Sequence, residues 1–199
     1  MKLLMIMILS SLLLSTAAQS IPGTPTDISP LLIGEKIPDI QLSNLEGKKV
    51  SLNDIISKEQ TLLIFYRGGW CPYCNLQLAE LQSIESEILK SGFNIIAISP
   101  DSPDNLKASI EKHKLNYTLL SDSKTEAARA FGIAFQASER YGEMLGKASG
   151  SLNTQGLLPV PAVFVLNKQG EILFEYINPD YKKRLKGSLL LAVLAELKE

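Results

Sequence analysis

This sequence has few histidines and cysteines, and its acidic and basic residues nearly balance. One histidine and two cysteines occur among 199 residues. A structural zinc site needs about four Cys or His ligands, so no metal site is expected, and His113, in a charged stretch, is interpreted as a solvated helix residue. The 20 basic and 21 acidic residues leave a net charge of −1. This balance gives no indication of a nucleic acid or an anionic membrane as partner.

Long apolar runs are absent beyond the N-terminus. Lys2 precedes an apolar run over residues 3–14, and small residues at 16–20 fit a cleavage site. The run is shorter than the roughly 20 residues that span a bilayer. Residues 1–18 are therefore predicted to be a signal peptide, with an uncleaved N-terminal membrane anchor as the alternative. We expect export to the periplasm or the extracellular medium, without stable membrane insertion after cleavage.

The segment after the signal peptide is rich in proline and glycine. Residues 19–31 are interpreted as an irregular leader on this ground. Residues 32–199 are long enough for one domain with a sizeable core.

Both cysteines lie in one short motif between a predicted strand and a predicted helix. Residues 61–66 are apolar and rich in β-forming side chains, the following Arg-Gly-Gly breaks the run, and an amphipathic pattern begins at Pro72. Proline suits the first helical position because it has no N–H to lose. Cys71 is therefore predicted at a helix N-terminus, with Cys74 one turn further along the same face.

This position predicts different roles for the two thiols. Free N–H groups and the helix dipole stabilise a thiolate, and Arg67 adds a cation, so the pKa of Cys71 should fall below the usual value of about 8.5. Cys71 is predicted to be the nucleophile and Cys74 the resolving cysteine. A structural disulfide is the alternative, although so short a loop removes little unfolded-chain entropy. For Arg67, the alternative is a simple ion pair with an acid.

The rest of the chain alternates predicted strands and helices, which indicates a central sheet with parallel strands. A final hairpin adds an antiparallel edge. We predict an α/β fold, a three-layer α/β/α sandwich with a mixed central sheet. The helix that begins at Pro72 is expected to bury an apolar side formed by Leu76, Leu78, Leu81, Ile84 and Ile88.

These features together resemble the thioredoxin fold. The order of elements matches, the motif Trp-Cys-Pro-Tyr-Cys begins at Trp70, and a Val-Pro pair precedes the predicted strand at 162–166. In that fold a cis-proline before the third core strand packs against the active-site cysteines. The resemblance implies that the Val160–Pro161 bond is cis, and it implies a set of supporting site residues: Arg67, Trp70, Pro72, Tyr73 and Pro161.

A narrower resemblance is to the peroxiredoxin superfamily, the alkyl hydroperoxide reductase and thiol-specific antioxidant group. Residues 33–42 and 45–52 are similar to the opening of that group. Residues 98–103, 119–122 and 130–133 resemble its middle insertion, which plain thioredoxins lack. The resemblance covers the chain from about residue 32 to the C-terminus.

Two positions depart from that group. Typical peroxiredoxins place a threonine three residues before the reactive cysteine, where this chain has Gly68, and an arginine near the position of Pro161. Both residues bind the peroxide and stabilise the departing oxygen, so their loss should weaken transition-state stabilisation by several kcal/mol. Arg67, the Tyr66 hydroxyl and the backbone N–H groups of residues 73 and 74 are the candidate substitutes.

The resemblance implies an exported antioxidant oxidoreductase that reduces hydroperoxides through a Cys71–Cys74 dithiol cycle. The alternative is a thiol–disulfide oxidoreductase acting on protein disulfides, and a lesser one is a redox-inert binding domain. No cofactor is expected because sulfur carries the chemistry. The expected partners are a peroxide or disulfide substrate and an external dithiol reductant such as a thioredoxin-like protein.

Overall fold

The structure is a computed structural model that describes residues 20–198. The predicted signal peptide lies outside the described residues. The helices and strands follow one another as β1 (Gln41–Ser43), β2 (Lys49–Ser51), α1 (Leu52–Ile56), β3 (Gln60–Phe65), α2 (Pro72–Ser83), α3 (Glu85–Lys90), β4 (Phe93–Ser99), α4 (Pro103–His113), β5 (Thr118–Ser121), α5 (Glu126–Ala130), β6 (Ala134–Gln136), a 3-10 helix η1 (Glu139–Tyr141), α6 (Gly142–Ala148), β7 (Leu157–Pro159), β8 (Ala162–Leu166), β9 (Ile172–Ile177) and α7 (Gly187–Leu197).

Seven of these strands form a mixed central sheet in the order β2-β1-β5-β4-β3-β8-β9. The three central strands β5, β4 and β3 are parallel, whereas β8 and β9 continue the sheet antiparallel. At the other edge of the sheet, β1 pairs with β2 antiparallel as a hairpin. Sequence analysis missed the second sheet, in which β6 pairs with β7, because both strands have only three residues.

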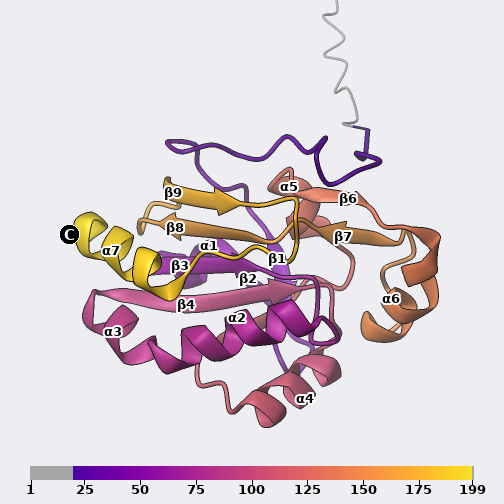
Figure 1. The fold of residues 1–199 in the computed structure, drawn as a ribbon, viewed down its shortest axis with the longest axis horizontal. Coiled ribbons are helices and arrows are strands. Elements are labelled where there is room, and N and C mark those ends of the chain that lie inside the picture. Colours follow the sequence, from indigo (N-terminus) through magenta and orange to yellow (C-terminus); the bar gives the residue numbers. More distant parts are fainter. Residues whose placement is uncertain (1–19, 199) are drawn as a thin grey trace, which may run out of the picture.

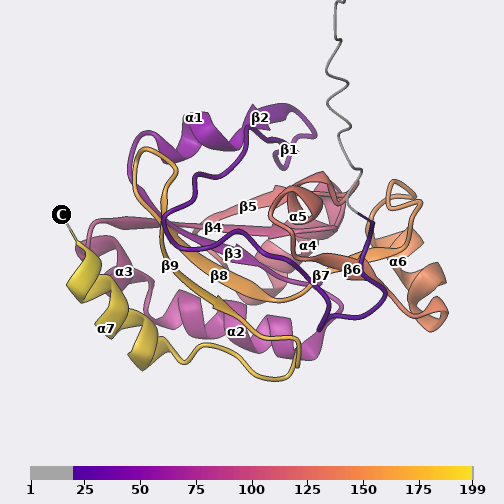
Figure 2. The same ribbon diagram turned by 90° about the horizontal axis from the view of Figure 1, so that it is seen from above.

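Helices cover both faces of the central sheet, which confirms the predicted α/β class. Buried side chains of α2, α3, α4 and α7 share one apolar cluster with the sheet, and those of α1 and α5 share a second cluster on the other face. Figure 2 shows α1 and α2 on opposite sides of the strands. In Figure 1 the arrow of β4 points toward the end of the sheet where α6 lies, and α2 begins at this end.

The helix after the cysteine motif differs from its prediction in two respects. It ends at Ser83, and α3 starts anew after Ile84, whose ψ of 12° is not helical. In α2 the buried positions are 74, 77, 78 and 81, so the buried stripe follows the helical period. Leu76 falls outside this stripe and is 68% exposed. Its prediction as a core residue is wrong.

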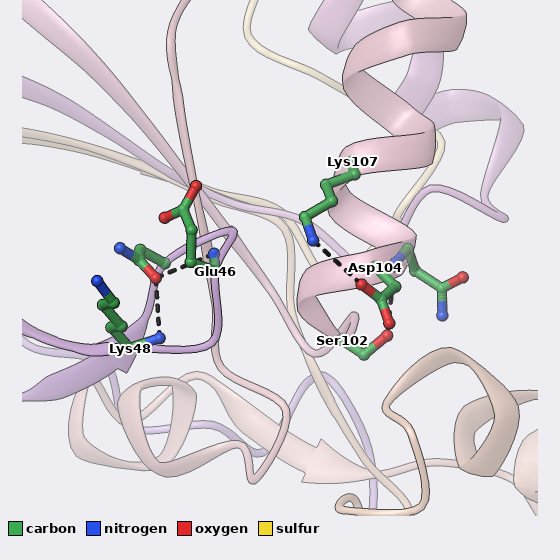
Figure 3. Close-up of polar contacts among 7 residues, drawn as sticks. Glu46, Lys48, Ser102, Asp104 and Lys107 are labelled. Atoms are coloured by element: carbon green, nitrogen blue, oxygen red, sulfur yellow. Dashed lines mark hydrogen bonds and ion pairs between the residues drawn. The ribbon is translucent and has the colours of Figure 1, made fainter.

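Local polar contacts fix the turns that frame the sheet. The Asn44 side chain accepts hydrogen bonds from the backbone N–H groups of Glu46 and Lys48 in the β1–β2 turn. The Ser102 hydroxyl caps α4 by accepting from the N–H of Asn105, and Asp104 pairs with Lys107 on the first turn (Figure 3). Pro103, the first residue of α4, suits this position because it has no N–H to lose.

The described part of the leader has no helix or strand, yet it is bonded to the domain. The N–H of Leu31 donates to the carbonyl of Phe131, and the carbonyl of Pro22 accepts from the N–H of Gln136. The boundaries proposed at residues 18 and 31 stay predictions. Within residues 20–198, no helix combines the length and the apolar character that crossing a bilayer requires.

Candidate active site

The cysteine motif lies where β3 ends and α2 begins. Cys71 is the N-cap of α2, with extended backbone angles and no side-chain cap hydrogen bond, and Pro72 follows at the first helical position. The carbonyl of Cys71 accepts from the N–H groups of Cys74 and Asn75. The thiol of Cys71 therefore lies beside the positive end of a helix of 12 residues.

The two thiols lie close together and differ in acidity. The pKa of Cys71 is lowered to about 6, first by a hydrogen bond from the Cys74 side chain, with further lowering by the Cys74 backbone and by the charges of Arg67 and Arg184. Burial raises the pKa of the Cys74 thiol well above its ordinary value, and the neighbouring Cys71 adds to the effect. Cys71 is thus the thiolate at neutral pH, and Cys74 carries the proton. The direction for Cys71 agrees with the sequence prediction, although the main cause is the second thiol.

Both sulfur-bearing side chains are buried. Cys71 is 1% exposed, and Cys74 is inaccessible. Tyr73 follows on the outer side, 36% exposed, with its ring against that of Tyr181 at a centroid distance of 5.7 Å.

The side chain of Arg67 lies near Cys71, as predicted, and its guanidinium packs against aromatic rings. Its guanidinium carbon lies 4.2 Å from the ring centroid of Tyr181, 4.9 Å from that of Trp70 and 5.1 Å from that of Tyr141. The side chain is 4% exposed. No ion pair of Arg67 occurs within residues 20–198, so the alternative of a simple ion pair does not hold there.

A buried carboxylate holds the loop that precedes Cys71. The carboxylate of Asp101, just after β4, accepts a hydrogen bond of 2.7 Å from the N–H of Gly69. Burial raises the pKa of Asp101 to about 6. The N–H of Cys71 in turn donates to the carbonyl of Gly68. Asp101 therefore positions the backbone that leads into the motif.

Gly68 adopts a backbone conformation that excludes the threonine of typical peroxiredoxins. Its φ is +136°, and a Cβ at this position would overlap the indole nitrogen of Trp70 and lie 2.7 Å from the Asp101 carboxylate. The side chains of Trp70 and Asp101 fill the space that a threonine side chain at position 68 would need.

The expectation of a cis-proline at Pro161 is wrong. None of the peptide bonds in the described part of the chain is cis. The chain passes from β7 into β8 through only two residues, and the trans form is the intrinsically preferred one for an X–Pro bond. Since Phe65 pairs with Ala162, the same register places Pro161 beside the residue that follows Phe65, at the edge of the sheet where the motif lies.

The Tyr66 hydroxyl, a predicted substitute donor, is not directed to an open site. Tyr66 is fully buried in the cluster between the sheet and α2, and its hydroxyl has no hydrogen-bond partner. Burial and the nearby Asp101 charge raise its pKa well above the usual value. Its ring acts as core.

Arg184 is the site residue that sequence analysis missed. It lies in the segment between β9 and α7, and its Nη2 donates to the Sγ of Cys74 at 3.3 Å. No local sequence signal connects it with a motif 110 residues away. Its place follows only from the path of the chain over the start of α2.

A cavity of about 330 Å³ adjoins the loop before Cys71. Gly69, Trp70 and Asp101 line it together with side chains of α4 and α6. Within the described residues no group of three or more His, Cys, Asp or Glu side chains is arranged to hold a metal ion.

Comparison with known proteins assigns the chain to a family. Residues 33–174 match the AhpC/TSA family, and the chain belongs to this family. It is 39% identical to a putative peroxiredoxin bcp of Haemophilus influenzae over 106 residues, which is 53% of this chain and 68% of that one. It is 28% identical to peroxiredoxin Bcp of Escherichia coli strain K12, over 85% of this chain and 99% of that one.

A solved structure shows the same fold. Reduced Prx3 of Vibrio vulnificus in complex with H2O2 superposes with a TM-score of 0.71 at 16% identity, covering 82% of this chain and 99% of that chain. The fold is thus the thioredoxin-like fold of peroxiredoxins, and the chain is a peroxiredoxin-like enzyme of the thiol peroxidase class.

Proposed function

We propose that this protein reduces hydroperoxides through a cycle between the Cys71–Cys74 dithiol and its disulfide. The observation that carries the proposal is the pairing of a Cys71 thiolate, with a pKa of about 6, and a protonated Cys74 beside it. Membership of the AhpC/TSA family supports the peroxide as substrate. The low exposure of Cys71 supports a small substrate over a protein disulfide.

The chemical steps follow from the two thiols. The Cys71 thiolate attacks one peroxide oxygen, the O–O bond breaks, and the second oxygen leaves with a proton as water or an alcohol. Cys71 is now a sulfenic acid. The Cys74 thiol attacks its sulfur, the S–S bond forms, and the oxygen leaves as water. An external dithiol, such as that of a thioredoxin-like protein, reduces the disulfide and closes the cycle.

The departing oxygen needs stabilisation that Gly68 and Pro161 cannot supply. Arg67 is a cation suited to this role, because its side chain is buried among three aromatic rings and forms no ion pair within residues 20–198. An uncompensated buried charge of this kind acts strongly on charge that develops nearby. We assign Arg67 the electrostatic role that the threonine and arginine hold in typical peroxiredoxins.

The second candidate function is thiol–disulfide exchange with protein disulfides. The exposed Tyr73 and Leu76 beside the motif favour it, since they offer a contact surface for another chain. The absence of the threonine at Gly68 also favours it. The third reading, a redox-inert binding domain, is disfavoured by the lowered pKa of Cys71.

We further propose that the protein works outside the cytoplasm. The N-terminal apolar run and its small-residue cleavage site support export. Expression of the full chain followed by cell fractionation and N-terminal sequencing tests this proposal. A mature protein that starts near residue 19 supports it, and an intact N-terminus on a cytoplasmic protein contradicts it.

Two variants separate the candidate functions. Cys74→Ser should consume one peroxide per chain and stop at a Cys71 sulfenic acid that dimedone traps, because the first step needs only Cys71. In disulfide exchange the same variant should accumulate mixed disulfides and react with peroxide no faster than an ordinary thiol of similar pKa. Cys71→Ser, the control, should be inactive in both assays. Slow reaction with peroxide and fast turnover of a disulfide peptide would contradict the proposal.

A further inference from the structure

The segment between β9 and α7 brings a cation directly to the resolving cysteine. Nη2 of Arg184 lies 3.3 Å from the Sγ of Cys74. Two contacts of this segment fix it against α2: the side chain of Leu185 is buried in the cluster that contains both cysteines, and the N–H of Gly187 donates to the Glu80 carboxylate at 2.8 Å. Arg184 therefore reaches the sulfur from an anchored segment.

The remaining hydrogen-bonding groups of Arg184 are not used elsewhere. Its Nε and Nη1 are buried and have no hydrogen-bond partner among residues 20–198. Within residues 20–198 the ion pairs are Lys107–Asp104 and Lys147–Glu143, so no carboxylate neutralises Arg184 there. Burying a guanidinium without an anion is unfavourable. The position of the Arg184 guanidinium becomes favourable when the Sγ of Cys74 carries negative charge.

Cys74 passes through such a charged state twice in the cycle. When it attacks the Cys71 sulfenic acid, its S–H bond breaks, an electron pair of the sulfur forms the S–S bond, the S–O bond of Cys71 breaks, and the oxygen takes up the proton and leaves as water. When an external thiolate attacks the Cys71 sulfur of the disulfide, the S–S bond breaks and its electron pair goes to the Sγ of Cys74, which then takes up a proton. In both steps the charge on Cys74 develops in a buried site.

We propose that Arg184 is a catalytic residue for the resolving cysteine, which stabilises the negative charge on the Sγ of Cys74 during both disulfide formation and disulfide reduction. The proposal rests on the proposed Cys71–Cys74 cycle. Both arginines lower the pKa of Cys71, but only Arg184 donates a hydrogen bond to the Sγ of Cys74, whereas Arg67 is assigned to the oxygen that leaves the peroxide. Within residues 20–198, no other cationic side chain donates a hydrogen bond to the Sγ of Cys74.

Rapid kinetics with three variants test the assignment. Fluorescence of the single tryptophan, Trp70, reports oxidation by hydrogen peroxide in stopped flow. In Arg184→Gln the sulfenic-acid phase should change less than the disulfide-forming phase, which should slow about tenfold or more, as expected for the loss of a charge-assisted hydrogen bond. Dimedone should then trap more sulfenic acid than in the wild type. Arg184→Lys, which keeps the charge, should recover part of the rate.

A matched control and a second assay keep the result unambiguous. Lys183→Gln removes the same charge from an exposed side chain of the same segment and should leave both phases within about twofold. Reduction by dithiothreitol of a disulfide preformed with diamide needs no peroxide, and Arg184→Gln should slow it about tenfold. If peroxide fails to react while this reduction is slowed, the peroxidase proposal falls and Arg184 keeps its role. Equal slowing by Lys183→Gln, or unchanged disulfide formation and reduction in folded Arg184→Gln, would overturn the inference.

Discussion

The two faces of the central sheet are built by the same strands and bury different chemistry. Along β3, Leu62 and Ile64 point to the cluster that contains α2, whereas Leu63 and Phe65 point to the cluster that contains α1 and α5. The α2 face holds the two thiols and the hydroxyls of Tyr66 and Tyr117 within the core. The other face is an apolar cluster, with the buried carboxylate of Asp122 at the start of α5.

Aromatic packing shows how the apolar face contributes stability. The rings of Phe65, Phe131 and Phe164 pack against one another at centroid distances of 4.8, 6.1 and 5.1 Å. Such pairs add to the free energy of simple burial. On the α2 face, thiol and hydroxyl groups occupy core positions that apolar side chains could otherwise fill. The difference indicates that stability and reactivity are placed on opposite sides of one sheet.

Phe164→Ala should have the largest effect on stability. It removes the shared ring of this aromatic group from a fully buried position, so the free energy of unfolding should fall by about 3–5 kcal/mol. Denaturant titration measures the loss, and Leu76→Ala, an exposed position, is the control. The pH at which Cys71 becomes reactive should stay unchanged. A shift of that pH would show that packing on the face of α1 and α5 affects the acidity of Cys71 on the α2 face.

Gly68→Thr should have the next largest effect, on the reactive face. The substitution restores the family's threonine, but its Cβ meets Trp70 and Asp101 at a φ of +136°. Backbone strain and crowding should each remove about 1–3 kcal/mol of stability. Peroxide turnover should fall. Gly92→Thr, at a φ of +87° with no atom within 4 Å, isolates the strain. Faster turnover in Gly68→Thr would mean that the loop adapts to the threonine.

The sequence predicts the central motif well because its signals are local. A β-forming run, a break and a proline at the first helical position define the site of Cys71 within a dozen residues, and the structure places β3 and α2 there. The prediction for Leu76 is wrong because this residue is two positions from both Cys74 and Leu78, which places it on the opposite side of an α-helix from the buried stripe.

The surroundings of the motif come from distant segments and have no such signal. Asp101 is 32 residues from Gly69, and Arg184 is 110 residues from Cys74. Tertiary packing alone brings them to the start of α2. The position of Asp101 is partly predictable. Asp101 follows β4, the parallel neighbour of β3, and the carboxyl ends of adjacent parallel strands lie at the same edge of a sheet. The trans bond at Pro161 shows that a family position does not determine a local isomer.

The acidity of Cys71 should depend on its partner thiol more than on the helix. Iodoacetamide labelling of the reduced protein should rise with pH through a midpoint of about 6, since the thiolate predominates above the pKa. Cys74→Ala removes the hydrogen bond that is the main cause of the lowered pKa, so the midpoint should rise by about one pH unit or more. An unchanged midpoint would assign the effect to the helix dipole and the arginines.

Asp101→Asn should have the smallest effect, a pH-dependent change in stability. Burial raises the pKa of this carboxyl from 3.8 to about 6 in the folded protein. Its contribution to stability is therefore fully present below pH 3.8 and is lost as pH rises through 6. Asparagine does not ionise and can still accept the hydrogen bond from Gly69. The variant should gain stability relative to the wild type between pH 4 and 7, by up to about 1–3 kcal/mol.

Denaturant titration of both proteins across this pH range measures the change. Asp122, whose pKa burial raises to about 7, is present in both proteins, so its contribution cancels in the difference. Asp104→Asn, at a side chain 92% exposed, is the control for removal of a carboxylate and should change the free energy of unfolding by no more than about 0.5 kcal/mol. A difference between wild type and Asp101→Asn that stays constant with pH would mean that Asp101 keeps its charge throughout. The carboxylate would then act as a permanent anion beside the loop that leads into Cys71, and the reactive face would owe its pH dependence to the thiols alone.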